Sequence, residues 1–345
     1  MTLTAKKEYN YCLDFVKGLA CIFVVFMHCE FPGIMGIGVQ TISRFCVPFF
    51  FMVSGYFCFR SKQSIPDDDN GSNKWNTIKR KVVHVAKITF WSSLLYLAFA
   101  IAFQFVFHSY DFTINTKKIA DWIVFNQPWV LSGHLWFLFA LLYVYIFYGI
   151  FECNGLRKYA YIIAAVMFVV YVCLAQGAYL IGVTIPNIYY RNWLVEGFPF
   201  FMLGHWIHEN HARISLSNTT LIVIIVLTTI LCCVERWLLG RDFGVNMVTI
   251  PQVWALFVYG VKNPLFHKGG IQRMGRDCSM YIYILHIAVW QSIVNGVYSL
   301  LGISESLPAQ YFKPVAVLVL TIILSLLLNS VIKLYKSNRI STKIT

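Results

Sequence analysis

Residues 11–29, YCLDFVKGLACIFVVFMHC, form an apolar stretch long enough to cross a bilayer as a helix, yet the stretch contains Asp14, Lys17 and His28. A charged side chain at the centre of a bilayer costs roughly 2.5 to 3.5 kcal/mol on insertion scales, so an ionisable residue inside a span is a candidate for function. Lys17 and His28 are about three helical turns apart, which places them on one face with a rise of roughly 16 Å between them. This spacing predicts a pathway along one helix face.

The rest of the chain is equally apolar. Of its 345 residues, 58% are hydrophobic and only 12% are charged, a balance far outside that of soluble domains. We therefore expect an all-α, polytopic helical bundle that forms a single membrane-embedded domain over residues 1–345. At about 20 residues for each crossing, the sequence predicts about ten spans near 11–29, 37–59, 82–107, 134–152, 159–175, 193–209, 218–235, 246–261, 278–300 and 313–333.

The distribution of positive charge predicts the orientation of these spans. With the N-terminus inside, most of the 28 Lys and Arg residues lie in cytoplasmic segments, as the positive-inside rule requires. Both termini are then cytoplasmic. The net charge of +13 is explained by this topology and by attraction to anionic lipid or ligand. We expect no nucleic-acid partner, because the sequence has no soluble basic domain to bind one.

A basic run enters the third predicted span at its cytoplasmic end. It contains Arg80, Lys81, His84 and Lys87, several of which share a helix face at spacings of three and four. One interpretation is a set of cations whose side chains extend to the membrane interface. The other is an entrance that attracts the phosphates of a ligand.

Other polar residues stand at or inside the predicted spans. Arg44 precedes the apolar part of the second span, His134 opens the fourth, and Glu196 lies in the sixth, five residues after Arg191. An ion pair of Arg191 with Glu196 explains these two residues as well as a catalytic role does. His286, in the ninth span, is interpreted as a histidine that is hydrogen-bonded within the bundle.

The sequence does not predict a metal centre. His205, His208 and His211 recur at spacing three, but no carboxylate pair completes a ligand set. The cluster Asp67, Asp68 and Asp69 is typical of a solvated turn. The ten cysteines show no paired CxxC spacing, so neither zinc nor a disulfide framework is indicated.

Taken in order, several segments resemble the acyltransferase 3 family of bacterial membrane O-acyltransferases. The segment from Leu13 to His28, with a basic residue, ten intervening residues and a histidine, is similar to the family's first helix. VPFFFMVSGY (47–56) resembles its second helix, HLWFL (134–138) its fourth, and Tyr283 to His286 a late helix. Two positions depart from the family pattern: Lys17 stands where arginine is usual, and the arginine pair of the third helix is replaced by a looser basic set around Arg80.

The resemblance implies transfer of an acyl group, commonly acetyl, from cytoplasmic acyl-CoA to a hydroxyl of a cell-surface glycan or its lipid-linked precursor. It also implies a multi-pass protein of the bacterial cytoplasmic membrane, with acyl-CoA as a donor substrate rather than a permanently bound cofactor. The partners are then acyl-CoA, the glycan acceptor and membrane lipid. On this hypothesis the acyl-CoA contacts are Lys17, Arg80, Lys81, His84 and Lys87.

His28 is the expected general base for the acceptor hydroxyl, because a neutral imidazole with a pKa near 6.5 suits proton transfer at neutral pH. Arg44, His134 and Glu196 are candidate contacts to the acceptor or to the developing oxyanion. Direct attack by the hydroxyl and a transient acyl-histidine both fit this arrangement. Two other interpretations of His28 stay open: a histidine bonded to a backbone carbonyl in the bundle, and the proton relay of a multi-span transporter for a small polar solute or acyl group.

Overall fold

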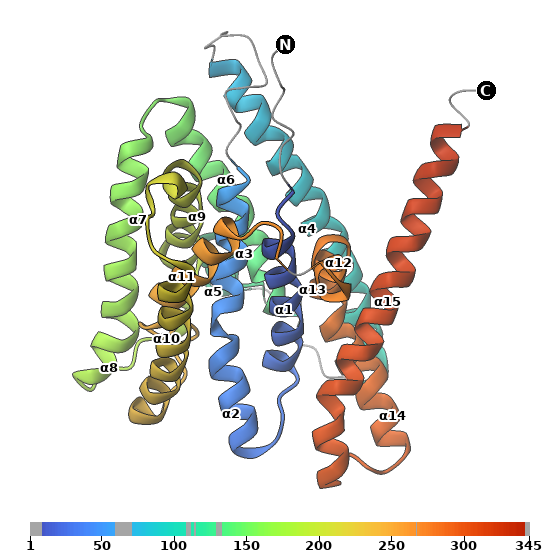
Figure 1. Ribbon diagram of the computed structural model, residues 1–345. Helices are drawn as coiled ribbons and strands as arrows, with labels where there is room; N and C mark the ends of the chain where they lie inside the picture. The colour runs from blue at the N-terminus through green and yellow to red at the C-terminus, as the bar shows by residue number, and fades with distance from the viewer. Residues whose placement is uncertain are drawn as a thin grey trace. The chain divides into compact units, whose positions relative to one another are not determined.

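The computed structural model describes residues 9–58, 71–107, 112–113, 115–128, 133–266 and 268–341, and the regular secondary structure within these ranges is entirely helical (Figure 1). The helices of the first half are α1 (Tyr11–His28), α2 (Gly33–Ile42), α3 (Cys46–Tyr56), α4 (Gly71–Phe107), α5 (Thr116–Phe125), α6 (Trp136–Cys153), α7 (Arg157–Val172) and α8 (Ala178–Leu180). They are followed by α9 (Phe198–Asn210), α10 (Asn218–Leu239), α11 (Thr249–Lys262), α12 (Gly270–Asp277), α13 (Ser279–Ala288), α14 (Asn295–Leu300) and α15 (Leu307–Ser341).

Short 3-10 and π segments connect several of these helices. The 3-10 turns are Ser43–Phe45, Gly133–Leu135, Asn187–Tyr189 and His211–Arg213. π-Helical turns occupy Cys173–Gly177, Trp193–Gly197 and Val289–Val294. The π turn Trp193–Gly197 runs directly into α9, and the π turn Val289–Val294 directly follows α13. Both turns therefore widen helices that carry candidate site residues.

The prediction of an all-helical, polytopic bundle is confirmed. Within the described ranges, eight helical stretches are long and apolar enough to cross a membrane: Tyr11–His28, Gly33–Tyr56, Lys74–Ala102, Gly133–Cys153, Arg157–Leu180, Asn218–Leu239, Ser279–Leu300 and Leu307–Ser337. They correspond to eight of the ten predicted spans. The other two predictions, 193–209 and 246–261, fall on α9 with its π turn and on α11, which has 14 residues against the roughly 20 of a full crossing.

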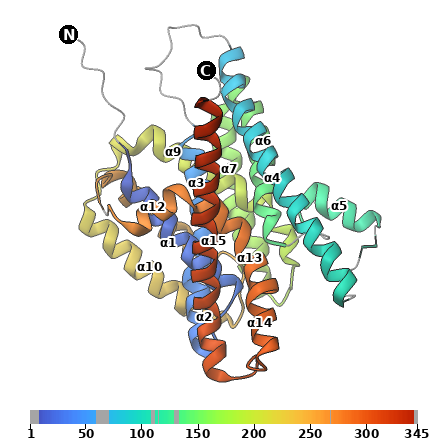
Figure 2. The same ribbon diagram turned by 90° about the vertical axis from the view of Figure 1, so that its right-hand side faces the viewer.

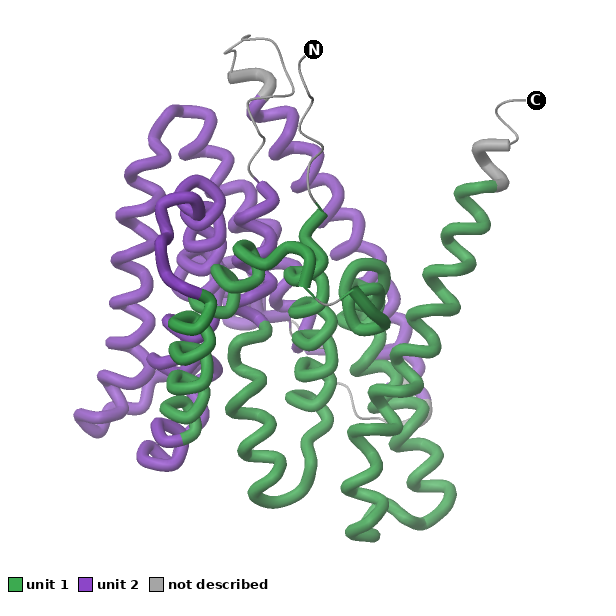
Figure 3. The backbone as a smooth tube through the Cα atoms, in the orientation of Figure 1, with its two compact units in different colours: residues 1–46, 218–233, 255–345 green, residues 47–217, 234–254 purple. Residues whose placement is uncertain are grey.

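The chain divides into two compact units, which are coloured separately in Figure 3. Unit 1 comprises residues 1–46, 218–233 and 255–345, and unit 2 comprises residues 47–217 and 234–254. The segments of each unit come from distant parts of the sequence. Each unit therefore has its own long-range packing.

Unit 1 is organised around α1. This helix begins after Asn10, whose side chain accepts a hydrogen bond from the Leu13 amide as an N-cap. It packs against α12, α13 and α15, which Figures 1 and 2 show beside it. α12 approaches α1 so closely that a Cβ on Gly275 would lie 2.0 Å from the Asp14 carbonyl oxygen. Glycine at this position is what lets the two backbones meet.

Unit 2 contains an equally close crossing between α3 and α9. A Cβ on Gly55 would lie 1.9 Å from the Phe201 carbonyl oxygen, and one on Gly204 would lie 2.0 Å from the Met52 carbonyl oxygen. Gly55 of α3 therefore packs against the backbone of α9, and Gly204 of α9 packs against the backbone of α3. Elsewhere in the unit α4 packs on α6, and α6 and α9 both pack on α7.

Candidate functional site

His28 is the last residue of α1, in unit 1. The helix ends there because Cys29 takes an extended conformation, while its amide still donates to the Val25 carbonyl at 2.9 Å. The imidazole is half-buried. His28 thus lies at the C-terminal end of the first membrane helix.

A second histidine lies against His28. The ring of His286, from α13, is centred 5.1 Å from the His28 ring at an interplanar angle of 45°. His286 is 1% exposed, and its Nδ1 is 3.0 Å from the Ile282 carbonyl oxygen. Since a carbonyl can only accept, Nδ1 carries the proton and Nε2 of the neutral ring carries the lone pair. The expected hydrogen bond within the bundle is present, but the nearness to His28 was not predicted.

Arg44 lies at the same end of α1. Its guanidinium Nη1 donates to the sulfur of Met27 at 3.4 Å, beside His28 in the sequence. The side chain is half-buried within unit 1, on the 3-10 turn that leads into α3. Arg44 therefore lies near the end of α1 that carries His28.

Lys17 lies near the other end of α1, where an acidic partner accompanies it. Its ammonium is 2.6 Å from the Asp14 carboxylate, which also accepts a hydrogen bond from the Tyr9 hydroxyl. Burial and this hydrogen bond raise the pKa of Tyr9, so the phenol stays a neutral donor. The Lys17 side chain is only 18% exposed. Its charge is already balanced inside the fold, which weakens the case for a direct phosphate contact.

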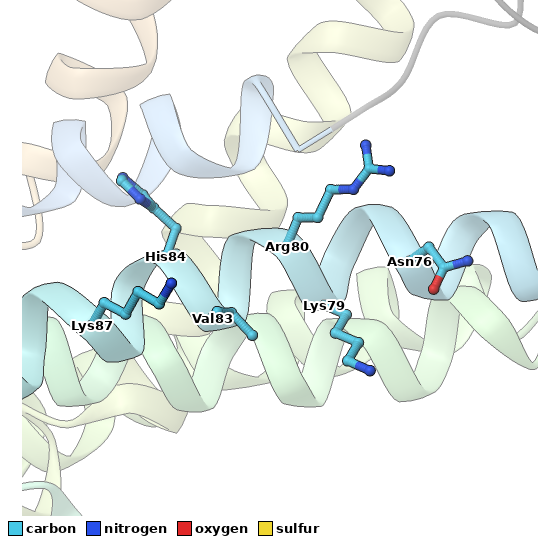
Figure 4. A pocket seen from close by; sticks show the side chains of 6 residues that line it. All are labelled: Asn76, Lys79, Arg80, Val83, His84 and Lys87. Atoms are coloured by element: carbon cyan, nitrogen blue, oxygen red, sulfur yellow. The ribbon is translucent and has the colours of Figure 1, made fainter. Parts of the chain in front are cut away.

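A groove runs along one face of α4 in unit 2. Its volume is about 540 Å³, and its lining residues are Asn76, Lys79, Arg80, Val83, His84 and Lys87. Figure 4 shows Arg80 and His84 projecting to one side of the helix, with Lys79 pointing to the other. Three of the four basic residues predicted on this helix thus share one groove, and Lys79 joins them.

Lys81 is the exception among the four. Its ammonium donates to the Phe57 carbonyl at 2.9 Å and lies 6.0 Å from the centre of the Tyr145 ring. It therefore satisfies a carbonyl at the end of α3 instead of lining the groove. The spacing of Lys81 in the sequence is compatible with either orientation of its side chain, and the hydrogen bond to the Phe57 carbonyl holds the ammonium outside the groove.

His134 and Glu196 are buried in unit 2, whereas His28, Arg44 and His286 belong to unit 1. The His134 ring contacts Tyr96 edge to face at 5.0 Å. Glu196 is 2% exposed and lies in the π turn Trp193–Gly197 that leads into α9. The predicted acceptor contacts are thus divided between the two units.

Arg191, the proposed ion-pair partner of Glu196, stacks its guanidinium over the Trp136 indole at 4.9 Å. Between them in the sequence, Asn192 caps the π turn by accepting from the amides of Leu194 and Val195, both at 3.0 Å. Asn192 and Glu196 are buried in this turn of unit 2, and Arg191 packs beside it on Trp136.

One buried polar network was not predicted at all. The Tyr161 hydroxyl donates to Glu209 at 2.5 Å and lies 2.7 Å from Nδ1 of His205, and the Tyr148 hydroxyl is 2.9 Å from the Nε2 atom of His205. Because Tyr161 gives its only proton to the carboxylate, it must accept from Nδ1–H, which leaves Nε2 to accept from Tyr148. Arg157 anchors the network by binding Glu209 and, on its other side, Glu152.

The described ranges contain no cluster of His, Cys, Asp or Glu that could bind a metal ion. His205 is occupied by the two tyrosines, and the Nδ1 atom of His211 donates to the His208 carbonyl at 2.9 Å. The predicted solvated turn at residues 67–69 lies outside the described residues.

Comparison with known proteins identifies the family. No curated protein and no solved structure matches the chain. A family model described as an acyltransferase domain matches residues 10–333, which include His28, Arg44, the α4 groove, His134, Glu196 and His286. The match covers nearly the whole chain, so the protein is an acyltransferase embedded in a membrane by several helices, and it belongs to the acyltransferase 3 family.

Proposed function

We propose that the protein transfers an acyl group, expected to be acetyl, from cytoplasmic acyl-CoA to a hydroxyl of a cell-surface glycan or its lipid-linked precursor. The observation that carries this proposal is the position of His28: half-buried at the end of α1, with the Arg44 guanidinium bound to the neighbouring Met27. A base and a cation at one end of a membrane helix are what acyl transfer to a hydroxyl requires. Family membership favours this chemistry over solute transport.

In the proposed reaction the acceptor oxygen attacks the thioester carbonyl while His28 removes its proton. An O–C bond forms, the C–S bond breaks, and the CoA thiolate leaves and takes up the proton from His28. Arg44 stabilises the negative charge on the carbonyl oxygen between these steps. An acyl-histidine on His28 is the alternative order of events, with the same net balance.

The cationic groove on α4 is the proposed docking surface for the phosphates of acyl-CoA. The groove carries the cationic side chains Lys79, Arg80 and Lys87, and His84 lies among them. Charged groups that line a groove raise the local concentration of an anion and bind its oxygens with charge-assisted hydrogen bonds. Lys17 and Lys81, which have partners within the fold, are assigned structural roles in this scheme.

We place the protein in the bacterial cytoplasmic membrane with both termini inside. Within unit 1, α1 and α15 run in opposite directions, so that the start of α1 and the C-terminal part of α15 lie on the same side (Figures 1 and 2). The distribution of lysine and arginine assigns that side to the cytoplasm.

The test of the proposed function is CoA release by the purified protein in lipid nanodiscs. With acetyl-CoA and a cell-envelope glycan extract, CoA is expected to appear only when both substrates are present, and labelled acetyl is expected to enter the glycan. CoA release with no transfer of label would instead show a thioesterase. Failure to turn over acetyl-CoA and longer acyl-CoA donors with every envelope fraction would reject the proposal.

Removing charge from the groove is expected to weaken acyl-CoA binding without changing the chemical step. The double variant Arg80→Gln, Lys87→Gln loses two charge-assisted contacts, so KM for acyl-CoA should rise at least about 10-fold while kcat stays within a few-fold. The dependence of KM on salt should also become weaker. Initial rates at several ionic strengths measure both effects.

Lys158→Gln provides the matched control for the groove variant. This exposed lysine lies over the Tyr159 ring on α7 and does not line the groove. Its KM should remain that of the wild type. An equal rise in KM for both variants would show a general effect of net charge, and an unchanged KM in the double variant would remove the groove from acyl-CoA binding.

A further inference from the structure

Two arginines of unit 2 lie where the distribution of charge predicts few cations. Arg191 precedes the π turn Trp193–Gly197, and Arg241 lies in the loop 240–248. In the orientation proposed above, both are on the outer side of the membrane, although the positive-inside rule collects lysine and arginine on the cytoplasmic side. Cations placed against this rule point to a partner on the outer side.

Arg191 is well separated from the cationic groove on α4. At the groove-bearing part of α4, a Cβ on Gly149 of α6 would lie 3.1 Å from the Ile78 side chain. Arg191 packs instead on Trp136, the first residue of α6, with 4.9 Å between the guanidinium and the ring centre. Trp136 precedes Gly149 by 13 positions, a rise of roughly 20 Å along the helix. The arginine and the groove thus lie towards opposite ends of unit 2.

Both arginines act on the same hydroxyl group, that of Tyr190. Burial raises the pKa of this phenol, and the charges of Arg241 and Arg191 oppose the rise. The loop that carries Arg241 also meets Arg191 directly, since a Cβ on Gly244 would lie 3.9 Å from the Cδ atom of Arg191. The two arginines are 50 positions apart in the sequence, and the fold of unit 2 brings their charges together.

Aromatic rings support the Arg241 guanidinium as well. It lies 5.4 Å from the ring centre of Tyr179 and 5.6 Å from that of Phe243, and it donates to the Thr184 hydroxyl at 3.3 Å. A guanidinium that stacks on an aromatic ring keeps its N–H edge for a carboxylate or phosphate, which it binds with two parallel hydrogen bonds. The compact ammonium of lysine lacks this fork.

The loop that carries Arg241 is held in place by buried side chains. The Tyr171 hydroxyl donates to the Phe243 carbonyl at 2.9 Å and accepts from the Val245 amide at 3.0 Å. The Gln176 side chain donates to the Val245 carbonyl, also at 3.0 Å. A cation on a fixed loop loses little conformational freedom when it binds an anion, which favours binding.

The carboxylates of this region are engaged by other donors. Glu235 accepts from two backbone amides of the loop, at 3.0 and 3.2 Å, and Asp242 accepts from a third at 3.1 Å. Glu196 is buried in the π turn. The ion pairs within the described ranges include neither Arg191 nor Arg241, and both side chains are half-buried. Their charges are therefore available to an anion from outside the protein.

We propose that Arg191 and Arg241 form a subsite for an oxyanion of the acceptor: the carboxylate of an acidic sugar, or a phosphate attached to the glycan. This inference rests on the proposed transfer to a glycan, and it specifies that the glycan is anionic. The arginines hold the acceptor through charge-assisted hydrogen bonds. No covalent bond to them forms or breaks, so they contribute to acceptor affinity and leave the chemical step to other residues.

The variants Arg191→Gln and Arg241→Gln test the subsite in the CoA-release assay. The protein is in phosphatidylcholine nanodiscs, and the acceptor is the anionic fraction of a cell-envelope glycan extract. Each variant loses a charge-assisted contact, so KM for this acceptor should rise at least about 10-fold, while kcat and KM for acyl-CoA stay within a few-fold. Arg191→Lys and Arg241→Lys keep the charge without the fork and should recover only part of the affinity.

Lys117→Gln is the matched control. Lys117 is an exposed cation of α5 in the same unit, and it takes part in none of the contacts described above. Its KM for the acceptor should remain that of the wild type. All rates are expressed per folded protein, measured by size-exclusion chromatography. An unchanged acceptor KM in both Arg→Gln variants, or an equal rise in Lys117→Gln, overturns the subsite.

Chemical treatment of the glycan distinguishes the two sources of negative charge. Reduction of carbodiimide-activated carboxylates removes the charge of acidic sugars, and aqueous hydrofluoric acid removes phosphate groups. One treatment should raise the wild-type KM for the acceptor to that of the Arg→Gln variants, and it identifies the anion. If neither treatment changes KM, or if the neutral glycan fraction is accepted with an equal KM, the acceptor is not recognised by its charge and the inference is overturned.

Binding without acyl-CoA separates the inference from the proposed function. In calorimetric titrations, the anionic glycan fraction should bind the wild type and bind both Arg→Gln variants at least about 10-fold more weakly. Such binding with no acetyl transfer would retain the subsite and reject the proposed function. Transfer with a wild-type KM in both variants would retain the function and reject the subsite. Unchanged glycan binding with loss of bound phosphatidylglycerol would assign the arginines to lipid and overturn the inference.

Discussion

Replacing His28 by alanine is expected to lower the kcat of glycan-dependent CoA release at least about 1,000-fold. The change removes the base that accepts the hydroxyl proton, and general base catalysis contributes on the order of 10² to 10⁴ in rate. KM for acyl-CoA should stay within a few-fold, because the groove on α4 is unchanged. The measurement is steady-state CoA release, with the amount of folded protein determined for each variant.

Glu30→Gln is the control for this experiment, since Glu30 is exposed two residues beyond His28 and is bonded to Gln40. Its activity should stay close to that of the wild type. Rapid mixing with acetyl-CoA alone then separates the two orders of events: an acyl-histidine gives a burst of one CoA for each wild-type protein, and direct transfer gives none. Comparable turnover in His28→Ala and the wild type would exclude His28 as the base.

The fold could be predicted from the sequence because membrane helices are encoded locally. A run of about 20 apolar residues is sufficient to indicate a span, and eight such runs became helices at the predicted positions. Shorter helices were harder to interpret. The stretch 246–261 is apolar enough to suggest a span, but its helix has only 14 residues and is flanked by the loop 240–248. Hydropathy alone does not show at which residue such a short helix begins.

The site was only partly predictable, because its partners are distant in the sequence. His28 could be identified as a costly residue in a span, and Arg44 as a candidate contact, but the hydrogen bond of Arg44 to Met27 appears only in the structure. His286 follows His28 by 258 positions, and only the packing of α13 on α1 brings the rings together. The salt bridge of Lys17 with Asp14, by contrast, has the spacing i, i+3 and could have been found from the sequence.

The network around His205 illustrates a second limit. His205 and Glu209 are one turn apart on α9, which is a local signal for a shared face. Their partners Tyr148 and Tyr161 come from α6 and α7, and apolar spans rich in tyrosine give no indication of which hydroxyl is paired. The direction of the hydrogen bonds follows only once all four residues are placed.

The largest loss of stability is expected from Gly204→Val, where α9 crosses α3 in unit 2. A Cβ at this position lies 2.0 Å from the Met52 carbonyl oxygen and 2.6 Å from its carbonyl carbon. These are backbone atoms of a helix, which no change of rotamer can move away. The helices must separate, and Gly55, which meets the Phe201 carbonyl from the opposite side, must lose its close approach as well. Overpacking of cores costs about 1 to 3 kcal/mol when side chains can adjust, so we expect at least about 3 kcal/mol here.

The measurement is the midpoint of thermal unfolding in detergent, followed by the fraction of protein that remains monodisperse after heating. Gly204→Ala should show a smaller loss than valine, but still a clear one. Gly296→Ala on α14 is the matched control, because a Cβ there meets nothing within 4 Å. Alanine is favoured over glycine in a helix by up to about 1 kcal/mol, so this control should be unchanged or more stable. If Gly204→Ala behaved like Gly296→Ala, α3 and α9 would not cross as closely as the backbone contact implies, and the arrangement of Tyr56 against His208 beside it would also require revision.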